Sequence, residues 1–341
     1  MIREACYKIT ENCPCNCLFC DSKEKYEKIF NKTNIGFEDW KLITDKLIKE
    51  GLEVVVLSGG EPLLQEDITF KLIKYLQNKD IYVVLNTSGI LFKNNKLLEK
   101  VKDNYPDLLV FSMDSAYPEQ HNFNRKKEGV FEQVVASIKD LKSSGDYPIA
   151  IRTVITRENY RQLPKIILDF NELGVDCIKL TNIEDDEEGK FRLELSDLEN
   201  FDNIVRKEII NSLEKCKYSD SHYKIENINK IKNLFSRKNG ISYEELSKGH
   251  FSPDLIGNVE CDLHQHFFSI ECNGVVLPCC EAEHHYSPKL GNLVEMTVDE
   301  MMNSQKFEDF KSNRQEYCIT CTQRHNLQLN FNETGTKVNR R

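Results

Sequence analysis

Apolar residues along the chain follow two periods in turn. From Phe37 to Leu47 they recur at helical spacing and the pattern stops at Gly51, which predicts a helix. The continuous apolar run Val54–Leu57 then predicts a strand that is buried on both faces. Near the N-terminus, Ala5–Thr10 is the first candidate strand. The chain therefore opens as strand, helix, strand.

The same alternation continues towards residue 180. Six alternations of strand and helix favour a parallel sheet, so the expected fold class is α/β, with a partial (β/α)6 TIM-like barrel. Functional residues of such a barrel are expected at the carboxyl ends of its strands. The further predicted elements are helices 68–76, 95–101, 130–141 and 163–173, and strands 81–85, 108–113, 148–155 and 175–180.

A polar stretch separates this region from the C-terminal part. Charged residues dominate from Asn182 to about Pro253, beginning with the acidic run 184–188, which is typical of a solvated loop or, alternatively, an edge of the substrate mouth. The expected organisation has four parts. They are a barrel at 1–183, a polar helical bridging region at 184–255, a small cysteine-containing domain at 256–325 and a frayed tail at 326–341.

Length and composition narrow the classes of protein. The 341 residues suffice for a large core and one appendage, and the net charge of -9, without a basic block, argues against a nucleic-acid partner. No apolar run is long enough for a signal core or a membrane span, so we expect a cytoplasmic protein. In a reducing compartment, thirteen cysteines favour metal ligation over disulfides. The abundance of Lys, Asn and Ile suggests a bacterial source.

Three cysteines follow the first predicted strand on one short loop. Cys13, Cys17 and Cys20 have the spacing Cys-x3-Cys-x2-Cys, which can hold three corners of a cubane iron–sulfur cluster and leave the fourth iron open. The competing interpretation is a zinc knuckle, with Cys15 as the fourth ligand. The open iron would be the place where chemistry occurs.

Two motifs together resemble the radical S-adenosylmethionine (SAM) superfamily. They are the cysteine loop, with aromatic Phe19 before its last cysteine, and Ser58–Pro62, which reads Ser-Gly-Gly-Glu-Pro after an apolar strand. The resemblance implies that Cys13, Cys17 and Cys20 bind a [4Fe–4S] cluster whose open iron chelates SAM. It also implies that the protein cleaves SAM to a 5′-deoxyadenosyl radical that abstracts hydrogen from carbon.

The remaining SAM contacts are expected at strand ends. Adjacent glycines allow the backbone to approach a ligand closely. Short polar residues at strand ends are further candidates, although strand termination would also explain them. A mid-strand arginine is costly to bury unpaired, so it is expected to meet the SAM carboxylate or, alternatively, an internal carboxylate. By resemblance, the candidate cofactor-binding residues are Phe19, Gly59, Gly60, Glu61, Pro62, Asn86, Ser112, Asp114 and Arg152.

A second cysteine set lies near the C-terminus. Cys261 precedes Gly274 and Cys279, and Cys318 and Cys321 follow later, so four thiolates can enclose another cluster or, alternatively, the zinc of a zinc ribbon. The spacing resembles the SPASM or twitch extension of radical SAM enzymes. No cysteine follows Cys321, so we expect a twitch-like domain with one auxiliary [4Fe–4S] cluster and two clusters in total.

Cys280 is a candidate catalytic residue. It follows the expected ligand Cys279, at a position where sulfatase-maturating relatives have an acidic group. A thiol there can return a hydrogen atom to a substrate radical, as in radical epimerases. The alternatives are a buried small residue or an exchangeable cluster ligand.

The leading hypothesis is a radical SAM oxidoreductase. A fully ligated auxiliary cluster is suited to accepting an electron, which favours oxidation or crosslinking of a small molecule, sugar or peptide. An external electron donor such as flavodoxin or ferredoxin would reduce the first cluster. Epimerisation through Cys280 is the alternative reaction, and a non-catalytic, metal-stapled binding protein is the rival from another class.

Overall fold

The structure is a computed structural model of the chain. It describes residues 1–20, 34–183, 189–218, 224, 227–229, 231–232, 234–235, 242–249, 261–279 and 288–318. Within these residues, no helix is both long and apolar enough to cross a membrane.

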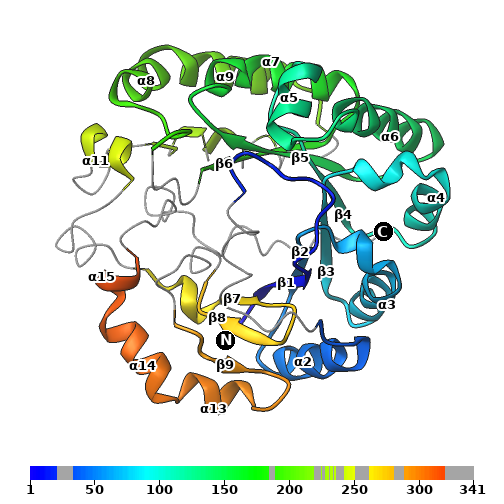
Figure 1. The fold of residues 1–341 in the computed structure, drawn as a ribbon, viewed down its shortest axis with the longest axis vertical. Helices are drawn as coiled ribbons and strands as arrows, with labels where there is room; N and C mark the ends of the chain where they lie inside the picture. Colours follow the sequence, from blue (N-terminus) through cyan, green and yellow to red (C-terminus); the bar gives the residue numbers. More distant parts are fainter. Residues whose placement is uncertain are drawn as a thin grey trace.

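A single nine-stranded sheet forms the centre of the molecule, in the order β6-β5-β4-β3-β2-β1-β7-β8-β9. Its first six strands pair in parallel, which confirms the α/β prediction, and they curve through an open arc in Figure 1. The strands are β1 (Glu4–Thr10), β2 (Val54–Gly59), β3 (Tyr82–Thr87), β4 (Leu108–Ser112), β5 (Ile149–Ile155) and β6 (Cys177–Asn182).

Helices cover the outer side of this arc (Figure 1). Alternate strand residues face them, so Tyr7 of β1 stacks on Trp40 with 4.7 Å between ring centroids. One helix, α5, was absent from the sequence prediction. The helices are α2 (Phe37–Lys49), α3 (Glu66–Gln77), α4 (Asn95–Asp103), α5 (Pro118–Arg125), α6 (Val130–Ser144) and α7 (Leu163–Glu172), with short turns η1 (Pro62–Gln65), η2 (Ile90–Lys93) and η3 (Tyr160–Gln162).

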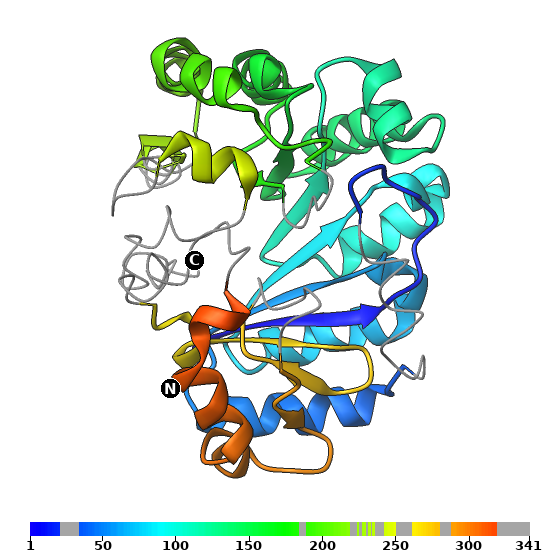
Figure 2. The same ribbon diagram turned by 60° about the vertical axis from the view of Figure 1, so that its left-hand side comes forward.

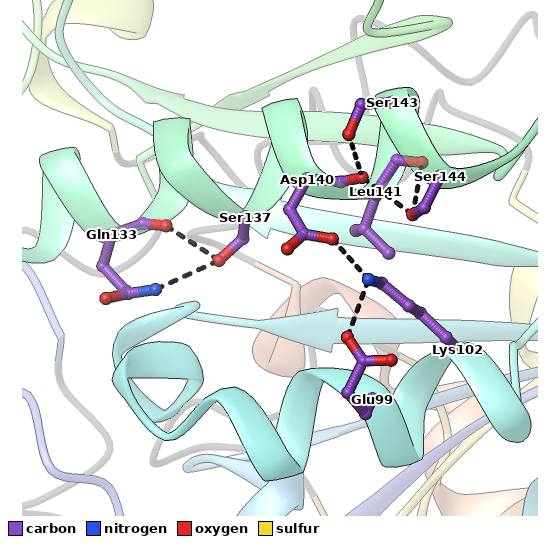
Figure 3. Close-up of polar contacts among 8 residues, drawn as sticks. All are labelled: Glu99, Lys102, Gln133, Ser137, Asp140, Leu141, Ser143 and Ser144. Atoms are coloured by element: carbon purple, nitrogen blue, oxygen red, sulfur yellow. Dashed lines mark hydrogen bonds and ion pairs between the residues drawn. The ribbon is translucent and has the colours of Figure 1, made fainter.

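Polar contacts also connect neighbouring helices on the surface. Figure 3 shows Lys102 of α4 reaching Glu99 on its own helix, at 2.8 Å, and Asp140 on α6. Exposed ion pairs of this kind each contribute less than about 1 kcal/mol. The buried apolar layer, rather than these pairs, stabilises the arrangement of the helices.

The polar middle region packs against the barrel. Its elements place Phe201, Ile209 and Leu213 in the same apolar core as the strands. An amphipathic stripe explains this burial despite the polar composition. The described elements are α8 (Leu195–Asn200), η4 (Phe201–Val205), α9 (Arg206–Lys215) and α11 (Tyr243–Lys248).

The C-terminal region continues the same sheet. Strand β7 pairs in parallel with β1, and β8 and β9 follow in antiparallel pairing. In Figure 1, helix α13 lies below this extension, and α14 and α15 continue up its left-hand side; Figure 2 shows the same helices from a second side. The elements are η6 (Leu263–Gln265), β7 (Phe267–Ile270), β8 (Val275–Leu277), β9 (Gly291–Asn292), α13 (Val298–Met302), α14 (Gln305–Ser312) and α15 (Arg314–Tyr317).

Two lysines join this extension to the barrel. Lys8 of β1 forms a buried ion pair with Glu271, directly after β7, at 3.1 Å. Lys46 of α2 donates hydrogen bonds to the carbonyl oxygens of Leu293 (2.7 Å) and Met296 (3.0 Å). The C-terminal region is therefore held against the barrel by buried charge and by side-chain hydrogen bonds as well as by the shared sheet.

Candidate functional site

The cysteine loop leaves β1 and passes directly over the end of β2. The amide of Gly60 donates to the Thr10 carbonyl oxygen at 2.6 Å, and the amide of Glu61 donates to that of Asn12 at 2.8 Å. A Cβ atom at Gly59 would lie 2.4 Å from the Thr10 oxygen, and one at Gly60 would lie 2.3 Å from the Asn12 oxygen. Backbone of the cysteine loop thus fills the space that these glycines leave.

This geometry adds a second physical reason for the two glycines. The sequence suggested that Gly59 and Gly60 let the backbone approach a ligand. In the structure the close neighbour is the chain itself at Thr10–Asn12, and Gly59 also has a φ of 120°. The glycine pair is required for the position of the cysteine loop. SAM contacts at these residues stay a prediction.

Glu61 is fully buried and connects β2 to the end of β3. Its carboxylate accepts hydrogen bonds from the Thr87 hydroxyl (2.8 Å), the Ser88 amide (2.8 Å) and the Ser88 hydroxyl (2.5 Å). Burial raises the pKa of Glu61, and the hydrogen bonds from Ser88 and Thr87 oppose that shift. Pro62, also buried, begins η1 behind it. The side chain of Glu61 thus fixes the loop that follows Asn86.

Two of the three loop cysteines are drawn together around a fourth thiol. Cys13 and Cys17 are half-buried, Cys15 between them is buried, and Cys20 is exposed. A hydrogen bond from the Cys15 thiol lowers the pKa of Cys13, and the same contact, with Arg125 adding to it, lowers the pKa of Cys17 to about 6. Thiolates are the cluster-binding form, so the donor chemistry fits an iron–sulfur cluster.

Helix α5 holds the cysteine loop from the other side. The amide of Leu18 donates to the Asn124 carbonyl oxygen at 2.8 Å, and the amide of Asn16 donates to that of Arg125 at 3.2 Å. The Arg125 Nη1 atom lies 3.6 Å from Cys17 Sγ, and the guanidinium carbon lies 5.8 Å from the Phe19 ring centroid. The sequence prediction missed Arg125, because nothing in a short polar segment marks it as buried.

Asp114, just beyond β4, points to the same arginine. It is fully buried, forms an ion pair with Arg125 and accepts a hydrogen bond from the Val154 amide at 3.1 Å. Burial raises the pKa of Asp114, and the adjacent guanidinium opposes that shift. The observed contacts of Asp114 are therefore with the protein, and they orient Arg125.

Other predicted contacts face the inner side of the sheet. Ser112 of β4 is aligned with Arg152 of β5, which in turn is aligned with Lys179 of β6. The expectation that Arg152 is buried is wrong: it is exposed, and its Nε donates to the Thr181 hydroxyl at 3.2 Å. No cost of burying an unpaired charge therefore arises there.

The second cysteine set gathers near the opposite end of β1. Glu4 of β1 pairs with Phe267, which lies six residues after Cys261, and β8 returns antiparallel to end just before Cys279. Arg314, in the helix that precedes Cys318, donates to the Cys261 carbonyl oxygen at 2.8 Å. Cys261 is thus linked to the helix before Cys318, and Cys279 follows a strand that returns towards the same end of β1; all three cysteines are half-buried.

Two residues of the predicted site, Cys280 and Cys321, lie outside the described residues. Among the residues that are described, no group of three His, Cys, Asp or Glu side chains has the arrangement of a metal site. In the first loop, Cys13 and Cys17 both contact the Cys15 thiol, and the exposed Cys20 donates its amide to the Cys17 carbonyl oxygen at 3.3 Å. The ligand sets at both ends of β1 thus remain assignments by residue type and position.

Comparison with family models identifies two regions of the chain. Residues 7–170 match the radical SAM superfamily, and residues 261–322 match the SPASM iron–sulfur cluster-binding domain. The chain belongs to the radical SAM superfamily and carries a C-terminal SPASM domain. SAM, a [4Fe–4S] cluster and auxiliary iron–sulfur chemistry are therefore its cofactors.

Among characterised relatives, the chain is similar to an AdoMet-dependent heme synthase of Methanosarcina barkeri. It is 29% identical over 49% of this chain and 47% of the relative. It is also similar to a PqqA peptide cyclase of Bradyrhizobium diazoefficiens, with 25% identity over 52% of this chain and 45% of the relative. The chain spans about half the length of these curated relatives.

Solved structures support the fold. Streptococcus suis SuiB bound to S-adenosylmethionine superposes with a TM-score of 0.63 at 17% identity, covering 95% of this chain and 69% of SuiB. AnSMEcpe with bound AdoMet gives a TM-score of 0.64 at 19% identity, covering 91% of this chain and 80% of that protein. These likenesses establish that the barrel and its extension have the architecture of radical SAM enzymes.

Proposed function

We propose that this radical SAM enzyme oxidises or crosslinks a peptide or small molecule after abstracting hydrogen from carbon. The observation that carries the proposal is the position of Cys13, Cys17 and Cys20. They lie on a loop beyond the carboxyl end of β1, fixed between the glycine pair of β2 and the end of α5. At this end of parallel strands a barrel presents its reactive groups.

The residues of the chain have separable roles in this proposal. Cys13, Cys17 and Cys20 hold a [4Fe–4S] cluster, which when bound supplies the electron that cleaves SAM to a 5′-deoxyadenosyl radical. Ser112 and Arg152, aligned on neighbouring strands, bind the carboxylate end of SAM. Asn86 contacts its polar groups from β3. Glu61 keeps the loop after Asn86 in place.

The C-terminal domain serves as electron acceptor in this proposal. Cys261, Cys279, Cys318 and Cys321 would hold one auxiliary cluster, and four protein thiolates around it would suit electron transfer. A substrate bound between the two ends of β1 would lie between the cluster that binds SAM and the auxiliary cluster. Similarity to a peptide cyclase, and to SuiB, which has been solved with its precursor peptide SuiA, supports a peptide as substrate.

The first test is release of 5′-deoxyadenosine. Anaerobically reconstituted protein, given SAM and either dithionite or flavodoxin, should form it, and Cys17→Ser should abolish this. Cys216→Ser is the matched control because Cys216 is a half-buried cysteine on the outer side, at the end of α9, and should remain active. Protein that contains zinc and little iron would instead support the non-catalytic rival.

The second test separates the clusters. Cys318→Ser should lower the iron content by about half and still release 5′-deoxyadenosine, because the cluster that binds SAM remains. Product formation should stop. A product two hydrogens short of the substrate supports oxidation, and a Cys318→Ser variant that still forms the product contradicts the role of acceptor.

Epimerisation is the second candidate because a thiol, Cys280, directly follows Cys279. In deuterated water, an epimerase would place one deuterium on the product carbon, and Cys280→Ala would remove that incorporation. An oxidised product without deuterium would exclude this reaction.

A further inference from the structure

The end of α5 holds a buried cation against one of the expected cluster ligands. Arg125 is 8% exposed, and its Nη1 atom lies 3.6 Å from Cys17 Sγ. We propose that Arg125 is a positioning residue whose fixed positive charge favours reduction of the cluster that binds SAM. The inference rests on the proposed function only in that Cys17 is a ligand of that cluster.

Besides the contact with Cys17, two contacts prevent the guanidinium from turning away. Its Nη2 atom forms an ion pair with the fully buried Asp114, and its carbon lies 5.8 Å from the centroid of the Phe19 ring. Asp114 is itself fixed by the amide of Val154 at 3.1 Å, and Asn159 donates to the Asp114 carbonyl oxygen at 2.8 Å. The direction of Arg125 is therefore set by β4, β5 and the cysteine loop together.

Backbone hydrogen bonds also fix the distance between Arg125 and the Cys17 sulfur. Successive carbonyl oxygens at Asn124 and Arg125 accept hydrogen bonds from Leu18 and Asn16, on either side of Cys17. The helix then stops at Lys126, which has a φ of 47°. Any displacement of the cysteine loop would have to break these bonds. Loop and arginine consequently form one unit, and the cation stays beside the Cys17 sulfur.

Reduction adds an electron to a cluster that thiolates already make negative. Hydrogen bonds to the sulfurs and the local net charge both set the reduction potential of such clusters. A charge acts more strongly in the protein interior than in water. Arg125 offers both a donor and a charge to Cys17, while Asp114 partly neutralises the charge. Removing one partner or the other should therefore shift the potential in opposite directions.

The experiment is an anaerobic potentiometric titration followed by electron paramagnetic resonance of the full-length reconstituted protein. Arg125→Gln should lower the equilibrium constant for reduction by about tenfold, which is about 59 mV for one electron. Arg125→Lys keeps the charge, so its shift in reduction potential should be less than about half of the shift caused by Arg125→Gln. Asp114→Asn keeps the arginine and should raise the constant.

Arg161→Gln is the matched control. Arg161 also lies over an aromatic ring, with its guanidinium carbon 4.3 Å from the centroid of Tyr160, and pairs with Asp197 at 3.4 Å. It is exposed, and among the described residues no contact joins it to a cysteine. Its substitution should leave the potential unchanged. A control that shifts as much as Arg125→Gln would overturn the inference.

Three further results would also overturn it. The first is an unchanged reduction potential in Arg125→Gln with full iron content. The second is an equal lowering of the potential by Arg125→Lys and Arg125→Gln. The third is a lowering of the potential by Asp114→Asn, the same direction as for Arg125→Gln. If Arg125→Gln does not fold, the direction of the Asp114→Asn shift decides alone. A wild-type protein without a SAM-responsive cluster signal would instead refute the proposed function, so the two failures are distinguishable.

Discussion

Replacing Gly60 with alanine should displace the cysteine loop. The new Cβ atom would lie 2.3 Å from the Asn12 carbonyl oxygen and 2.5 Å from that of Glu11. Non-bonded carbon and oxygen atoms need about 3.5 Å, so the loop must move by about 1 Å. These neighbours are backbone atoms, which cannot rotate away as a side chain can.

The cost can be worked out from the same contacts. Overpacking costs about 1–3 kcal/mol. The shift also weakens the bonds from the Gly60 and Glu61 amides to the loop, at about 1 kcal/mol for each typical bond. We expect the free energy of unfolding of the apoprotein to fall by about 2–4 kcal/mol in urea.

Iron loading and SAM binding test the reasoning more directly than stability. Gly60→Ala should lose iron and sulfide at the SAM cluster, because Cys13 follows the displaced backbone. Gly129→Ala is the matched control: Gly129 has a φ of 77° and no atom within 4 Å of a Cβ, so it costs about 1–2 kcal/mol through backbone strain alone and should load fully.

One outcome would refute the argument from geometry. If Gly60→Ala loads iron as the wild type does but no longer binds SAM, the glycine makes room for the ligand and not for the loop. Full iron content together with normal SAM binding would show that the contact with Asn12 does not constrain the site.

Three other predictions concern the junctions and the C-terminal domain. Lys46→Ala should lower the free energy of unfolding by about 1–3 kcal/mol in urea, because two partly buried carbonyl oxygens lose their donor. As a control, Lys41→Ala breaks only an exposed pair with Asp45 and should cost under about 1 kcal/mol. Lys8→Met alone should lower the free energy of unfolding by about 3–5 kcal/mol, because it leaves Glu271 charged and buried. The double variant Lys8→Met with Glu271→Gln should lose less. Equal losses in the single and double variants would contradict a coupled pair. Burial, with Arg314 nearby, lowers the pKa of His264 to about 4. Between about pH 6.5 and pH 4 the unfolded chain therefore binds a proton that the folded chain does not. The free energy of unfolding should fall by up to about 3 kcal/mol as the pH drops through that window. His264→Phe should flatten this dependence in urea titrations at several pH values, and an unchanged slope would contradict the assignment.

The strands of the barrel were predictable because their burial is local in the sequence. The run from Val54 to Leu57 falls inside β2, and the predicted strand 148–155 contains β5. Parallel strands covered on both faces read as continuous apolar runs, so no knowledge of their neighbours is needed. The order of the first six strands then follows from the strand and helix alternation.

Helix α5 shows why part of the site was not predictable. Its residues His121, Asn122, Asn124 and Arg125 are polar and yet buried, so no apolar stripe marks the helix. Their burial depends on partners far along the chain, such as Leu18 and Cys17. Periodicity detects apolar burial and gives no signal for polar groups that are satisfied by tertiary contacts.

The glycine pair shows a neighbour that the sequence could not supply. The sequence assigned Gly59 and Gly60 to a ligand contact, which stays a prediction, and the structure adds a close contact with the backbone at Thr10–Asn12. Likewise, the short run at Phe267–Ile270 gave no indication that β7 would pair with β1. A sequence shows that a backbone must come near something, and only the fold shows what that neighbour is.

The pairing of β7 with β1 makes one strand common to both cysteine sets. One set lies beyond the carboxyl end of β1 and the other near its amino end, so the strand acts as a spacer of fixed length. With seven residues at about 3.3 Å each, that spacer measures about 23 Å. Insertion of one residue would lengthen it by about 3.3 Å and turn the following side chains to the other face. Under the proposed function, this strand would therefore set the separation of the two clusters as well as contribute to the core.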